Sequence, residues 1–175
     1  MSFIAVDPAT GEQIAEVPFE SAASVEAKVA AAQAAHLEWR LRPVEERIRP
    51  LLEAGRLLRE RKDEYGALMT REMGKPISQA VAEADKCAWV CEYYAAQAPD
   101  LLAPVDSPTD GTASYWTYRP LGIVLGIMPW NFPFWQVIRF ATPALTAGNA
   151  ALLKHAPSVP GCAAALDELF NDAGY

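Results

Sequence analysis

The stretch LGIVLGIMPWNFPFWQ, residues 121–136, decides how the fold is interpreted. It begins as a continuous apolar run, as in buried parallel strands, and then breaks at Pro129 and Pro133. One amide, Asn131, lies between these prolines among aromatic side chains. The prolines indicate a loop at the carboxyl end of a strand, which is the edge where open α/β sheets bind ligands. The stretch therefore predicts a strand followed by a loop with a candidate functional amide.

The residues after this loop continue the same alternation of elements. We expect a helix over 134–146 ended by Gly148 and Asn149, a short apolar strand over 150–154, and a helix over 160–173. Strand, helix, strand and helix in this order are typical of a βαβ unit with a parallel sheet. Because two parallel strands need further strands and helices to cover them, we expect the chain to be a fragment of a longer protein.

The part of the chain before residue 112 has a mainly helical pattern. We expect a hairpin over 3–19, a helix from Ser21 with Val25, Val29, Ala32 and Trp39 on one face, and helices over 43–61, 63–73 and 77–98. Pro50 should kink the second helix or move its start. Residues 98–111 contain three prolines and indicate a connection, and 113–118, ASYWTY, reads as a β segment.

Composition narrows the classes of function. The 175 residues include 51% hydrophobic and 21% charged residues, and the formal charge of -7 argues against general binding to nucleic acid or to an anionic membrane surface. The amino terminus lacks the pattern of a signal peptide, and the longest apolar run is too short to span a bilayer. Three cysteines without paired CxxC spacing favour a reducing compartment, so a cytoplasmic protein is expected.

Two loops carry the candidate chemistry, one after each predicted strand. They are Met128-Pro129-Trp130-Asn131 and Lys154-His155-Ala156-Pro157. Lys154 is placed to meet a ribose hydroxyl or a phosphate. A buried Asn131 would be costly without partners, and its NH2 group could donate to a developing oxyanion. A solvated or backbone-capping role is the commoner one for a single Lys or Asn, but two such loops together favour a nucleotide site.

Other polar candidates are weaker. Cys87 and Cys91 are four residues apart on a helix, but no His or acidic cluster completes a metal site, so packing and no metal are expected. Cys162 has no visible base and also reads as a packing residue. His36 reads as a surface residue.

Several motifs together resemble the amino-terminal portion of the NAD(P)-dependent aldehyde dehydrogenase superfamily. They are DPATGE (7–12), TREMGKP (70–76), RPLGIVLGIMPWNFPFWQ (119–136) and PALTAGNAALLKHAPSVP (143–160), in the family's order. Within the superfamily the chain is most similar to bacterial succinate-semialdehyde dehydrogenases. The resemblance implies an α/β fold in which helices lead into a Rossmann-type sheet, and oxidation of an aldehyde, such as succinate semialdehyde, through a cysteine thioester.

The resemblance also implies roles for individual residues. Asn131 matches the amide that stabilises the oxyanion. The residues that match the cofactor site are Ile127, Met128, Pro129, Trp130 and Asn131 on the first loop and Lys154, His155, Ala156 and Pro157 on the second. Many NAD-preferring members have a glutamate where this chain has Pro157; without that carboxylate, and with Lys154 and His155 nearby, we expect NADP to be accepted and favoured over NAD.

The resemblance further divides the chain and leaves an alternative open. It implies a hairpin and helical part of the cofactor domain over 1–111, a β segment of an oligomerisation region over 112–122, and the first βαβα part of the NAD(P)-binding domain over 123–175. A homodimer or homotetramer is expected.

No cysteine here aligns with the family's nucleophile, and its base glutamate comes later, so the 175 residues alone should be inactive. The alternative is a non-catalytic assembly module that pairs through an exposed β edge.

Overall fold

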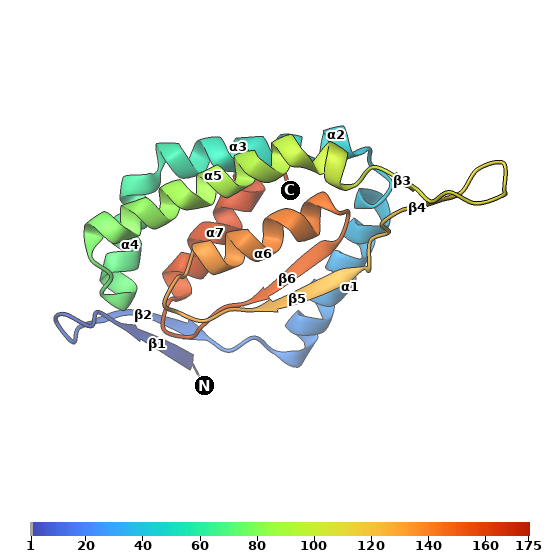
Figure 1. Ribbon diagram of the computed structural model, residues 1–175. Coiled ribbons are helices and arrows are strands. Elements are labelled where there is room, and N and C mark those ends of the chain that lie inside the picture. Colours follow the sequence, from blue (N-terminus) through green and yellow to red (C-terminus); the bar gives the residue numbers. More distant parts are fainter. Residues whose placement is uncertain (1) are drawn as a thin grey trace.

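A computed structural model describes residues 2–175 as a layer of helices packed on a short parallel sheet (Figure 1). The first half contains β1 (Ser2–Val6), β2 (Gln13–Pro18), α1 (Ala22–Trp39), α2 (Val44–Arg47), α3 (Arg49–Glu60), α4 (Lys62–Met73) and α5 (Ile77–Leu101). The second half contains β3 (Val105–Asp106), β4 (Tyr115–Trp116), β5 (Ile123–Ile127), α6 (Trp135–Thr146), β6 (Ala150–Lys154) and α7 (Pro160–Asp172). The predicted order of elements is confirmed.

The parallel pair β5–β6 is the part of the fold that positions the two candidate loops. Ile123 lies opposite Ala150 and Ile127 lies opposite Lys154, so the two strands end at the same edge. Helices α6 and α1 both pack against this pair. The expected βαβα unit is therefore present, and its two strand-end loops are neighbours.

The hydrophobic core lies between the helices of the two halves. Helix α5 packs against α3, α4 and α6, and α7 packs against α3 and α4. The largest fully buried apolar side chains include Leu51, Leu58, Met69, Phe134, Ile138, Leu166 and Leu169. Together with buried residues of α5 such as Ala84, Cys87 and Cys91, they form one apolar cluster that fixes the helical half against the βαβα half.

Turn and cap residues explain where several helices begin and end. The Ser21 side chain accepts a hydrogen bond from the Ser24 backbone N–H at 3.1 Å and caps α1. Gly74 ends α4 in the left-handed region, with φ of 73°. Pro50 lies in the first turn of α3, where its missing N–H costs nothing. The helix predicted over 43–61 is accordingly divided, and α3 starts afresh after Ile48.

Two boundaries differ from the sequence prediction. Helix α5 runs through Pro99 to Leu101. This proline lies in the last turn, so the backbone hydrogen bond that it cannot donate is lost only at the end of the helix. In the segment 113–118 only Tyr115 and Trp116 form a strand, paired with Val105–Asp106. This β3–β4 hairpin projects away from the helices (Figure 1).

Helix α1 corrects two expectations. His36 was expected at the surface but is only 6% exposed, because α1 packs against β6 and β5 and carries His36 on that contact face. On the predicted apolar face, Val25 and Val29 remain 48% and 43% exposed. The apolar face predicted for α1 is therefore only partly buried by the described residues.

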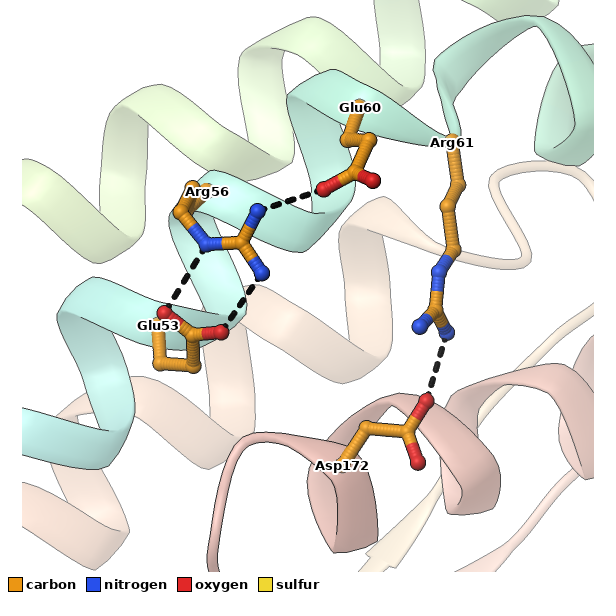
Figure 2. A network of polar contacts seen from close by, with 5 residues as sticks. All are labelled: Glu53, Arg56, Glu60, Arg61 and Asp172. Atoms are coloured by element: carbon orange, nitrogen blue, oxygen red, sulfur yellow. Dashed lines mark hydrogen bonds and ion pairs between the residues drawn. The ribbon is translucent and has the colours of Figure 1, made fainter.

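Surface ion pairs lie along α3 and between the α3–α4 junction and α7. Arg56 on α3 binds Glu53 at 2.7 Å and also Glu60, and Arg61, between α3 and α4, binds Asp172 of α7 at 2.7 Å (Figure 2). Exposed pairs of this kind each contribute about 0–1 kcal/mol, so the Arg61–Asp172 pair adds little to the packing of α7. Within residues 2–175 no helix is both long and apolar enough to cross a bilayer.

Candidate functional site

The two strand-end loops are joined by His155. Its Nε2 atom lies 2.9 Å from the Pro133 carbonyl oxygen, and its Nδ1 atom accepts the Ala156 backbone N–H at 2.7 Å. Because a carbonyl can only accept, Nε2 carries the proton, which fixes a neutral imidazole tautomer. Burial, the largest cause, lowers the pKa of His155 and keeps the ring neutral. The predicted site residues 127–131 and 154–157 therefore share one edge of the sheet.

Asn131 is exposed at the surface of its loop within the described residues, so its amide needs no buried partner there. The loop follows β5 at the edge where the strand pair ends, and Trp130, Asn131 and Phe132 are exposed there. The Asn131 Oδ1 atom accepts a hydrogen bond from Gln136 Nε2 at 3.4 Å. This contact points the amide oxygen toward α6 and leaves the Nδ2 hydrogens without a partner within residues 2–175.

A hollow of about 530 Å³ opens beside this amide. Helices α5 and α6 and the Asn131 loop line this Asn131 hollow with Gln79, Ala82, Glu83, Lys86, Asn131, Phe132, Trp135, Gln136 and Arg139. The Lys86 ammonium lies 4.0 Å from the centre of a Trp135 ring, and neither Lys86 nor Arg139 forms an ion pair with any residue in 2–175. The hollow thus combines a free amide donor, aromatic walls and two free cations.

A buried ion pair between Lys75 and Glu83 contacts the Asn131 loop and the start of α6. The Glu83 side chain is 2% exposed and its Oε1 atom accepts the backbone N–H groups of Phe134 and Trp135 at 3.0 and 2.9 Å. Its Oε2 atom pairs with Lys75 Nζ. Glu83 on α5 therefore caps the amino terminus of α6, where the helix dipole favours negative charge.

A second buried carboxylate caps α7 in the same way. Glu72 of α4 is 5% exposed and accepts the N–H groups of Gly161 and Cys162 at 2.7 and 2.8 Å. A Cβ atom on Gly161 would lie 2.7 Å from the Glu72 oxygen, so any larger residue there would displace this carboxylate from its position. Both helices of the βαβα half thus begin on carboxylates from the helical half.

The edge expected to hold the cofactor has a composition that suits a nucleotide. Lys154 is exposed and has no carboxylate partner among residues 2–175. Its strand partner Ile127 is 69% exposed, and Trp130 on the loop after β5 is 54% exposed. A free cation next to exposed apolar surface fits a phosphate or ribose beside a flat ring. Pro157 is exposed there too, whereas the Ala156 side chain is 8% exposed and packs into the core, so Ala156 can offer only its backbone.

All three thiols are packing residues, as predicted. Cys87, Cys91 and Cys162 are fully buried. Burial raises the pKa of each thiol, to about 12 for Cys91, so none is a thiolate near neutral pH. In the described part of the chain, no three His, Cys, Asp or Glu side chains gather closely enough to hold a metal ion.

Comparison with known proteins identifies the family. Residues 2–175 match the aldehyde dehydrogenase family. The chain belongs to this family. It is 48% identical over 175 residues to the probable succinate-semialdehyde dehydrogenase [NADP(+)] of Synechocystis sp., and 44% identical over 171 residues to the succinate semialdehyde dehydrogenase [NAD(P)+] of Escherichia coli. These matches cover 100% and 98% of this chain but 38% and 37% of the relatives.

Solved aldehyde dehydrogenases share the fold described above. The succinic semialdehyde dehydrogenase of Streptococcus pyogenes, in complex with NADP+, superimposes with a TM-score of 0.95 at 31% identity, over 99% of this chain and 38% of that one. The fold expected from the family resemblance is therefore confirmed, and the chain spans about two fifths of the length of these relatives.

Sequence reasoning missed the two buried carboxylates that cap α6 and α7. Glu83 lies four residues before Cys87 and beside Ala84 on the buried side of α5, and Glu72 follows the buried Met69 by three residues on α4. A carboxylate at a buried register position is a readable signal, since such groups are rarely buried without partners. What each carboxylate contacts, however, depends on residues 51 to 90 positions away.

Proposed function

We propose that this chain is the amino-terminal part of an NADP-accepting aldehyde dehydrogenase that oxidises succinate semialdehyde to the dicarboxylic acid. The names of the relatives from Synechocystis sp. and Escherichia coli support this substrate, as does the charge of the Asn131 hollow. In this proposal residues 1–111 are the hairpin and helical part, 112–122 belong to an oligomerisation region, and 123–175 begin the cofactor-binding domain.

Asn131 is the proposed oxyanion donor, and its free Nδ2 group is the observation that carries the proposal. When a thiolate adds to an aldehyde carbon, the carbonyl oxygen gains negative charge, and an amide N–H already in place stabilises that charge. Gln136 holds the amide oxygen, so the donor end of Asn131 faces away from this contact. The thiolate and the base that activates water would come from other parts of the enzyme.

The two free cations of the hollow give a physical reason for a substrate with a distant carboxylate. Succinate semialdehyde carries an aldehyde at one end and a carboxylate at the other. With its aldehyde at Asn131, a substrate of this kind would place the carboxylate among Lys86 and Arg139, while Trp135 and Phe132 contact the methylene groups. An uncharged aldehyde of the same length would leave both cations without a partner.

NADP would bind along the edge formed by residues 127–131 and 154–157. When bound, it accepts the hydride that leaves the substrate carbon. Lys154 would supply the positive charge, and Pro157 leaves no carboxylate to repel a 2′-phosphate. His155 contributes differently from the sequence expectation, because its neutral ring is engaged between the loops; it would shape the site without adding charge.

The β3–β4 hairpin is the proposed contact between subunits of a homodimer or homotetramer. It projects from the molecule, and Tyr115, Trp116 and Tyr118 are 60%, 48% and 58% exposed (Figure 1). Exposed aromatic residues on a short strand with free backbone groups are suited to pairing. Light scattering of the intact protein should show a smaller assembly after a double Tyr115→Ser and Trp116→Ser change.

Steady-state kinetics of the intact protein test the catalytic proposal. Asn131→Ala should lower kcat for succinate semialdehyde roughly 100- to 1,000-fold, as expected for loss of one oxyanion donor. Arg139→Gln should raise KM for succinate semialdehyde about tenfold or more and leave KM for butanal within about twofold, because only the first substrate carries the carboxylate. An unchanged kcat for Asn131→Ala would rule out the role of the amide. In a separate test, the 175-residue chain alone should produce no NADPH.

A further inference from the structure

We propose that Lys75 and Glu83 are positioning residues for Asn131: their buried ion pair holds the segment that follows the oxyanion-binding amide, from Phe132 to Trp135. This inference rests on the proposed function. It concerns residues that touch the loop rather than the reacting atoms.

Glu83 fixes the loop on its carboxyl side. Its Oε1 atom accepts the N–H groups of Phe134 and Trp135, three and four residues after Asn131. Although Glu83 borders the hollow, its side chain is 2% exposed, and both oxygens are already engaged, one by the two N–H groups and one by Lys75. Glu83 therefore acts on the start of α6 and not on a substrate.

Lys75 fixes the residue directly after the amide. Its Nζ atom lies 3.7 Å from the centre of the Phe132 ring and pairs with Glu83. Cation–π contacts are strongest where the ammonium is shielded from water, and Lys75 is 7% exposed. Lys75 contacts Phe132, and Glu83 binds the backbone of residues 134 and 135. The ion pair therefore restricts the movement of the segment 132–135, which directly follows Asn131.

The requirement for such support follows from the position of Asn131 itself. The amide is exposed and its own contact, with Gln136, is long at 3.4 Å. Gln136 belongs to the first turn of α6, so the position of the amide depends on where α6 begins. A misplacement of about 1 Å in a catalytic group can cost about 100-fold in rate, so the cap on α6 should be visible in kcat.

Glu72 provides a matched control for this inference. It is buried to a similar degree and accepts two backbone N–H groups at the start of a helix, but that helix is α7 and it does not follow the Asn131 loop. A Glu→Gln change at either position removes one charge from a helix cap. Only the change at position 83 should reach the amide.

The experiment measures kcat and KM of the intact protein at saturating NADP for Glu83→Gln and Glu72→Gln, each with Asn131 or with Asn131→Ala. We expect Glu83→Gln to lower kcat about tenfold or more, with KM for succinate semialdehyde within about threefold. In the Asn131→Ala background the same change should lower kcat less than about twofold further, because the group it positions is gone. Glu72→Gln should leave kcat within about twofold in both backgrounds.

Hydrogen exchange and two substitutions at Lys75 complete the test. The Phe134 and Trp135 amides should lose protection in Glu83→Gln and keep it in Glu72→Gln. Lys75→Met should lower kcat as Glu83→Gln does, and Lys75→Arg, which keeps the charge and can stack on Phe132, should restore kcat to within about threefold. If Glu83→Gln does not fold, the Lys75 pair of variants decides.

The outcomes separate the two proposals. Equal reductions of kcat by Glu83→Gln with and without Asn131 would overturn the positioning role while leaving the oxyanion donor in place. A normal kcat in Glu83→Gln despite lost protection at Trp135 would overturn it as well. If Asn131→Ala alone leaves kcat unchanged, the proposed function is wrong, and the positioning role is wrong with it.

Discussion

The two helices of the βαβα half begin on buried carboxylates, and the difference between these caps is instructive. Glu83 at α6 is paired with Lys75, whereas Glu72 at α7 forms no ion pair with any residue in 2–175. Both carboxylates accept two backbone N–H groups, so capping by itself does not require the lysine. The extra cation occurs at the helix whose preceding loop carries Asn131, which suggests that rigidity is needed there beyond what a cap supplies.

The largest difference should appear when each carboxylate is removed. Glu83→Ala leaves the Lys75 ammonium buried without a partner and should cost about 3–5 kcal/mol of unfolding free energy. Glu72→Ala leaves two N–H groups unsatisfied and should cost about 1–3 kcal/mol. Urea denaturation of the intact protein, followed by tryptophan fluorescence, measures both. Equal losses would show that Lys75 finds another partner or reaches water.

The next largest effect is the coupling energy of the Lys75–Glu83 ion pair, measured separately from the capping of α6 by Glu83. Lys75→Met and Glu83→Gln each leave one partner of the pair alone, whereas the double variant leaves neither, so its loss of stability should be smaller than the sum of the single losses by about 1–3 kcal/mol. A cycle that combines Lys75→Met with Glu72→Gln is the matched control and should be additive within about 0.5 kcal/mol. Additivity in both cycles would remove the distinction between the two caps.

A smaller effect concerns the aromatic contact found only at the Glu83 cap. Phe132→Leu keeps an apolar side chain but removes the ring beneath Lys75, and should cost about 1 kcal/mol. In the Lys75→Met background the same substitution should cost about half of that or less. An undiminished cost there would assign the effect to packing of Phe132 rather than to the cation.

The smallest effect tests the bond between the two strand-end loops. Burial lowers the pKa of His155 below its usual 6.5, so the unfolded chain binds a proton at a higher pH than the folded one. The contribution of His155 to stability is therefore complete above about pH 6.5 and is lost as the pH falls from there through the lowered pKa. Between pH 7 and 5 the midpoint of thermal unfolding should fall less in His155→Gln than in the natural protein; parallel curves would contradict the role of this ring.

The sequence allowed most of the fold to be predicted because its signals are local. Gly74 and Ser21 fix the ends of their helices, and the change from helical spacing to the apolar run 123–128 marks the start of the sheet. Errors arose where the decisive contact is distant. The burial of His36 and the exposure of Val25 and Val29 both depend on which segments α1 packs against.

The candidate site could be predicted only in part for the same reason. Position at the end of an apolar strand, together with the family motifs, was enough to select residues 127–131 and 154–157. The residues that complete the Asn131 hollow, Lys86 and Arg139, lie on the surfaces of two helices, and nothing in their own sequence context distinguishes them from other solvated cations. Only the fold brings the two side chains to the lining of the same hollow.

The sequence by itself determined the family, the order of elements and the loop that carries Asn131, because these follow from residue types at fixed local spacing. Only the tertiary structure decided that Glu83 and Glu72 cap the two helices of the sheet half, that Lys75 pairs with Glu83, that His155 joins the two strand-end loops, and that the amide of Asn131 keeps its donor end free within residues 2–175. These are contacts between segments far apart in the chain, and their geometry is fixed only when the shared core brings α3 to α7 together.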